Sequence, residues 1–235
     1  MHENSSSVPV SSMDRPPSLT DEAILDMQRF LNDFFRFDLS APVYLVRAAQ
    51  PKPGVIAEFE CGFGSAREKP RLADWSGPGY LVRLHDTGLS PPEFHSLLAH
   101  KIAHCFDPRL VPPTDCWCEN MDHNIQELVD EHLKSSGLPS DETGRWHFFH
   151  DAKFWRTALH VAHRLTEAGK ICHWDLLGVP ADPIFTMLAT VYWELDTLSQ
   201  LPLRKLAGRP VSGAFNKLFQ RVRTDVAPIR FTPIF

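Results

Sequence analysis

The chain has 235 residues, a net charge of -5 and 43% hydrophobic residues, which suits one domain of ordinary size with or without a helical appendage. It has no basic block, so its charge does not indicate nucleic-acid or membrane-surface binding, and no apolar run reaches the ~18 residues of a membrane-spanning helix. Five unevenly spaced cysteines argue against a disulfide framework, and no secretion-signal pattern opens the chain, so we expect a cytoplasmic, reducing location.

The N-terminal part divides into a tail and a helix. Residues 1–18 are rich in serine and proline and poor in large apolar residues, which is typical of disorder. From residue 20 to about residue 37 apolar side chains recur at helical spacing, and Thr20 or Ser18 can cap this helix. Its expected apolar face contains Ile24, Met27, Phe30, Leu31, Phe34 and Phe35.

Three β-strand candidates follow, over residues 42–47, 55–61 and 79–85. They contain many β-branched or aromatic residues, and in the third strand apolar residues occupy every second position. The connections are short enough to predict an antiparallel or mixed sheet that packs against helices.

A helix with two histidines is expected next, over residues 90–107. Ser90 can cap it, prolines suit its first turn, and Glu93 stands where a capping box needs an acidic residue. Pro108 is the expected stop. The side chains that would bury one face are Phe94, Leu97, Leu98, Ile102 and Cys105.

The rest of the chain is expected to be mostly helical, with helices near residues 124–135, 151–169, 183–201 and 213–223. The predicted fold class is therefore α+β, with an N-terminal helix, a small three-stranded sheet, the histidine helix and a helical C-terminal part. The expected organisation is a tail (1–18), a main domain (19–170) and a helical extension packed on it (171–235).

The two histidines of the central helix, His100 and His104, are four residues apart. They therefore lie one turn apart on one face and can bind a single metal ion. The spacing matches the zinc-protease motif H-E-x-x-H except at Lys101, which stands at the position of the general-base glutamate. A lysine side chain is cationic at neutral pH and has no lone pair with which to take a proton.

A second motif lies downstream, where residues 150–155 read HDAKFW. Together with the order of helix, strands and H-x-x-x-H, it resembles SprT-like zinc metallopeptidases and related bacterial zincins over roughly residues 19–165. In these, an HG-x-x-[FW] segment supplies the third histidine, which matches His150 here, with Asp151 in place of the glycine and Phe154 as the aromatic residue. The resemblance implies a zincin-like domain over residues 19–170 and a zinc ion on His100, His104 and His150.

A second candidate for the third ligand is Glu127, because in some zincins a glutamate on a following helix completes the site. Glu131, one turn further along that predicted helix, could then be a neighbouring or supporting group. Asp107 either accepts a hydrogen bond from a ligand imidazole or caps the turn at Pro108. His150 is favoured over Glu127 as the third ligand.

Other residues are interpreted as structural. Cys116 and Cys118 have the wrong spacing for a zinc site and are read as reduced cysteines. His160 and His163 are favoured as surface or hydrogen-bonded residues rather than a second metal pair. Two aromatic clusters are expected in the core: Phe34, Phe35 and Phe37, and Phe148, Phe149, Phe154 and Trp155.

Two functions are therefore expected. The first is a zinc metallopeptidase scaffold for a protein or peptide substrate, inactive as written because of Lys101, either as a natural pseudo-enzyme or through an introduced substitution. The second is a non-catalytic interaction module in which residues 175–235 present a surface to a protein partner. DNA-bound substrates, common for SprT-like proteins, are not carried over, because this chain is acidic and has no basic tail.

Overall fold

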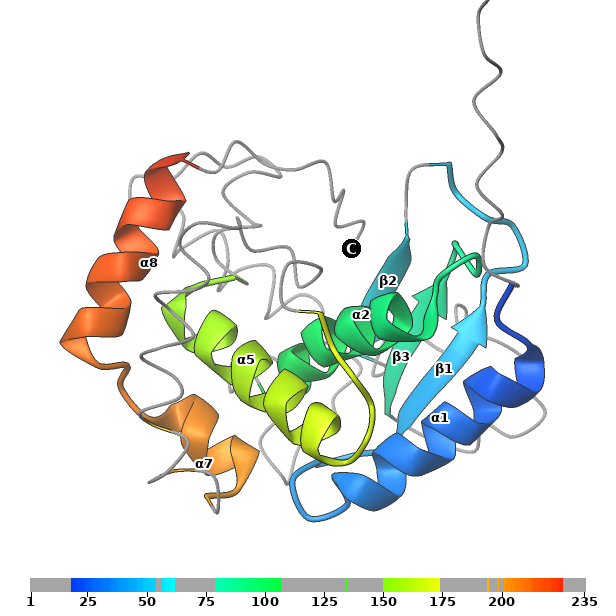
Figure 1. The fold of residues 1–235 in the computed structure, drawn as a ribbon, viewed down its shortest axis with the longest axis horizontal. Helices are drawn as coiled ribbons and strands as arrows, with labels where there is room; N and C mark the ends of the chain where they lie inside the picture. The colour runs from blue at the N-terminus through cyan, green and yellow to red at the C-terminus, as the bar shows by residue number, and fades with distance from the viewer. Residues whose placement is uncertain are drawn as a thin grey trace, which may run out of the picture.

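The computed structural model describes residues 18–53, 56–61, 79–106, 150–173 and 201–225, together with Lys134, Glu194 and Leu198. In this part the chain is α+β, as expected (Figure 1). The elements are α1 (Asp21–Phe34), β1 (Val43–Arg47), β2 (Ala57–Cys61), β3 (Tyr80–Leu84), α2 (Pro91–His104), α5 (Ala152–Glu167), α7 (Leu203–Gly208) and α8 (Gly213–Asp225). The helices expected near 124–135 and 183–201, and residues 1–17 of the expected tail, lie outside the described residues, apart from Lys134, Glu194, Leu198 and Leu201.

Helix α1 begins where its cap predicts and ends three residues early. The Thr20 hydroxyl oxygen accepts a hydrogen bond from the Ala23 amide at 3.1 Å. Phe35 is buried, but Phe34 and Phe37 are 41% and 84% exposed, so the expectation that both lie in the core was wrong. Phe37 lies beyond the end of the helix, where the Arg36 guanidinium stacks on its ring 4.4 Å from the centroid.

The three strands form one mixed sheet in the order β1-β3-β2, in which β3 runs parallel to β1 and antiparallel to β2. Tyr80, Val82 and Leu84 of the central strand face the main core. Gly79 lets β1 approach the start of β3, because a Cβ there would lie 2.5 Å from the Pro42 carbonyl oxygen.

Side chains of α1 cover the edge of β1 that does not pair with β3. The Asn32 amide exchanges two hydrogen bonds with the Val43 backbone, at 2.7 and 2.8 Å, and the Gln28 oxygen accepts from the Leu45 amide at 2.8 Å. Gln28 and Asn32 are one helical turn apart, so α1 acts as a substitute for a neighbouring strand. Figure 1 shows the helix running alongside β1.

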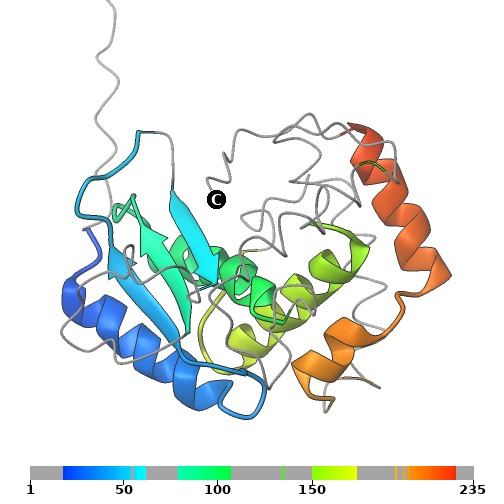
Figure 2. The same ribbon diagram turned by 180° about the vertical axis from the view of Figure 1, so that it is seen from behind.

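Helix α5 is the central element of the second half of the described structure. It packs against α2 on one side and against α7 and α8 on another (Figures 1 and 2). Its side chains are buried around most of its circumference, including those of Trp155, Arg156 and His160. Gly169, with φ 80°, ends the helix, and the Lys170 amide donates to the Leu165 carbonyl at 2.8 Å, as in a Schellman motif.

None of the helices in the described ranges is long and apolar enough to cross a membrane.

Candidate metal centre

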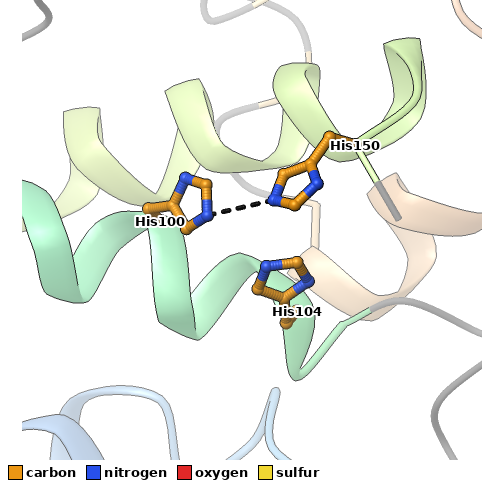
Figure 3. A group of neighbouring side chains, drawn as sticks. All are labelled: His100, His104 and His150. Carbon is orange, nitrogen blue, oxygen red and sulfur yellow. Dashed lines mark hydrogen bonds between the residues drawn. The ribbon is translucent and has the colours of Figure 1, made fainter. Parts of the chain in front are cut away.

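Three histidines from two distant parts of the chain converge. His100 and His104 lie on consecutive turns of α2, and His150 directly precedes the N-cap residue of α5 (Figure 3). Their potential ligand atoms all lie within 4.8 Å of one another, and the Nε2 atoms of His100 and His150 are 3.2 Å apart. His104 and His150 are buried and His100 is partly buried.

This geometry suits a metal ion. Two imidazole nitrogens bound to one zinc ion at 2.0–2.1 Å in a tetrahedral arrangement are separated by about 3.3 Å. The observed 3.2 Å between His100 Nε2 and His150 Nε2 is close to that separation. Three imidazoles also form the ligand set that leaves a fourth position open, and imidazole suits Zn, Cu, Fe and Ni. The residues present therefore fit a transition-metal ion.

The sequence of α2 accounts for where this helix begins and which side chains it buries. The Glu93 carboxylate accepts hydrogen bonds from both the amide and the hydroxyl of Ser90, each at 2.7 Å, so the predicted capping box forms. These hydrogen bonds lower the pKa of Glu93. Phe94, Leu98 and Ile102 are buried in the main core together with residues of α1, the sheet and α5. The helix ends at His104 rather than at the expected Pro108, which leaves His104 in its last turn.

His150 is held by the start of α5. The Asp151 carboxylate accepts a hydrogen bond from the Phe154 amide at 2.9 Å and so caps the helix one residue after His150. The Phe154 ring lies 5.1, 4.4 and 4.7 Å from the rings of His100, His104 and His150, measured between centroids. This single aromatic side chain therefore contacts all three histidines.

Two further aromatic rings among the described residues also lie against the cluster. Trp155 lies 5.7 Å from His100 and 5.9 Å from His150, again between centroids. Phe59 of β2 stacks on His104 at 5.2 Å. Phe154 and Trp155 were expected in the core, and both are buried. Phe59 was not predicted as part of the site, although its alternation within β2 could have placed it on the core face.

The remaining predicted site residues have different outcomes. Lys101 follows His100 on α2 and is partly buried. Asp107, Glu127 and Glu131 lie outside the described residues. Of the two candidates for the third ligand, His150 lies in the cluster with His100 and His104. Cys116 and Cys118 also lie outside them.

Two other described histidines, His95 and His160, have partners away from the cluster. His95 Nδ1 lies 3.0 Å from the Ile171 carbonyl oxygen, and burial lowers the pKa of the ring. His160 is fully buried, not on the helix surface, with its Nε2 atom 3.5 Å from the Glu194 carboxylate. Burial lowers the pKa of His160 as well, against the opposing effect of Glu194.

Comparisons of this chain with models of protein families, with curated proteins and with solved structures give no match. Its function must therefore be inferred from the geometry of the three histidines and their surroundings.

Proposed function

We propose that this protein is a zinc-binding protein built on a metallopeptidase scaffold, with His100, His104 and His150 as the metal ligands. The observation that carries the proposal is the convergence of these three imidazoles at ligand distance. A zincin-like fold is part of the proposal, supported by the order of helix, mixed sheet, histidine helix and downstream histidine that the SprT-like resemblance implies.

A peptide substrate is supported by the position of β2. This strand pairs with β3 and lies at the edge of the sheet that the described strands form, and its Phe59 ring stacks on the ligand His104. An extended peptide can add to a sheet edge through backbone hydrogen bonds. On β2 it would run past the metal centre. A bound zinc ion would supply polarisation of a carbonyl group and a water of lowered pKa.

The residues around the proposed metal ion differ from those of an active enzyme at the position of the general base. Phe59, Phe154 and Trp155 exclude water from the side of the cluster they cover, which strengthens electrostatic interactions there. Lys101 cannot act as the base that deprotonates a metal-bound water, because an ammonium group only donates. We therefore propose that the chain as written binds zinc but has little or no peptidase activity.

The test is the substitution Lys101→Glu, assayed on a broad peptide panel with zinc present. A positioned general base contributes typically 10²–10⁴-fold, so we expect hydrolysis to rise by at least about 10²-fold. Lys101→Gln is the matched control and should give no gain, and Lys101→Glu combined with His100→Ala should lose it. A Lys101→Glu protein that binds zinc and cleaves no peptide would contradict the peptidase scaffold.

The second candidate is a non-catalytic interaction module, favoured by Lys101 itself. Residues 175–235 would then present a surface to a protein partner. Metal analysis separates the two candidates: one zinc per chain, lost on His100→Ala, supports the metal centre. No bound metal, with stability unchanged by His100→Ala, supports the module.

A further inference from the structure

The three histidines of the described site carry no negative charge. Imidazole binds a metal as a neutral group. Among the residues that the structure describes, the group able to hold a metal consists of three histidines, with no carboxylate and no thiolate. A divalent ion held by these ligands keeps its full positive charge, which is the largest local charge in such a site.

Lys101 carries a second positive charge on the helix that supplies two of the ligands. It follows the ligand His100 and precedes the ligand His104 by three residues on α2, and residues three apart are neighbours on a helix surface. The same position in H-E-x-x-H holds the glutamate that reaches the metal-bound water. A side chain that starts from residue 101 can therefore reach a group at the open metal position.

The surroundings strengthen attraction for an anion. His104 and His150 are 6% and 5% exposed, and Phe154 and Trp155 are buried beside them. A low local dielectric makes each charge interaction stronger than in water. The carboxylate next to a ligand in the sequence, that of Asp151, accepts a hydrogen bond from the Phe154 amide, so it interacts with the N-terminus of α5.

We propose that the centre is a receptor for carboxylates, with one oxygen on the open metal position and the other accepting a hydrogen bond from the Lys101 ammonium. This inference rests on the proposed metal site but not on peptidase activity. A glutamate at position 101 would repel such a ligand, whereas a lysine attracts it. The substitution of the motif residue thus changes the preferred ligand from a neutral peptide carbonyl to an anion.

The experiment uses the full chain loaded with Co²⁺, whose visible absorption changes when a ligand enters its coordination sphere, and acetate as the probe. Loss of a charge-assisted hydrogen bond in Lys101→Gln should weaken acetate binding about tenfold. Lys101→Arg keeps the charge and should stay within about threefold of the wild type. Lys205→Gln, which removes the charge of an exposed lysine on α7, is the matched control and should change nothing.

A second arm identifies the source of the carboxylate. A short peptide with a free C-terminus is compared with the same peptide amidated at that end. Tighter binding of the free peptide than of acetate assigns a peptide C-terminus, and equal binding assigns a small carboxylate.

Two outcomes would overturn the proposal. If Co²⁺ binds and acetate affinity is the same in wild type and Lys101→Gln, the receptor role of Lys101 is wrong while the metal site stands. If no Co²⁺ binds, both the receptor and the metal site are wrong.

Discussion

An aromatic ring and a helix cap lie next to the three histidines of the metal cluster. Phe154 contacts all three ligand rings, and Asp151 caps the helix that starts beside His150. The two histidines of α2 could be predicted from spacing alone, because a helix places residues four apart on one face. His150 could not, since 45 residues of chain lie between it and His104, and only the resemblance in HDAKFW pointed to it.

The buried His160 predicts how the stability of the protein depends on pH. Its pKa in the folded state is lowered by burial and by the charges of Arg164 and Arg156, while Glu194 opposes the shift. The unfolded chain therefore takes up the proton at a higher pH than the folded chain, so stability falls as the pH drops below about 6.5. We expect the free energy of unfolding of the metal-free protein to fall more steeply between pH 7 and 5 than that of His160→Gln.

Urea titrations in the presence of a chelator measure this slope. One proton of difference corresponds to at most about 1.4 kcal/mol per pH unit. Parallel slopes for wild type and His160→Gln would show that His160 is not the group responsible.

At the scale of the elements, the described helices longer than two turns were predicted well, because their caps are local. Thr20, Ser90 and Asp151 each stand at the N-cap of their helix, and Gly169 ends α5. Helix α7 was missed. It has six residues, too few for a periodic pattern, and distant side chains support its ends. Likewise, the parallel pairing of β1 with β3 depends on tertiary contacts and not on either strand's own sequence.

The cap of α5 can be tested directly. Asp151→Ala removes the acceptor for the Phe154 amide and should lower the free energy of unfolding by about 1 kcal/mol. It should also weaken zinc binding several-fold, because ordering His150 becomes part of the cost of binding. Asp151→Asn keeps a capping oxygen and is the matched control. Equal losses in the two variants, measured by urea unfolding, would contradict a capping role.

At the scale of the whole molecule, one buried and one partly buried polar side chain hold α7 against the rest of the described structure. Arg156 of α5 is 1% exposed and donates to three carbonyl groups around the end of α7, those of Leu206, Arg209 and Pro210, at 2.5 to 2.8 Å. Asp38, beyond the end of α1, accepts from the Leu203 amide at 2.6 Å and so supports the other end. Neither contact is readable from the sequence, because its partners are 50 or more residues apart.

Arg156→Met should therefore be strongly destabilising. It leaves buried carbonyl oxygens without their donor, and we expect a loss of about 3–5 kcal/mol in the free energy of unfolding. Arg204→Met, at an exposed position of α7, should stay within about 0.5 kcal/mol of the wild type. A loss for Arg156→Met as small as that for Arg204→Met would mean that α7 does not depend on this contact.

X-ray absorption at the zinc edge, on the protein dialysed to equilibrium with zinc, tests the metal centre most directly. We expect one zinc per chain, bound by three imidazole nitrogens at about 2.0–2.1 Å with no sulfur at about 2.3 Å, and the loss of one imidazole in His150→Ala. A protein that retains no zinc, or zinc bound by sulfur, would contradict the three-histidine centre.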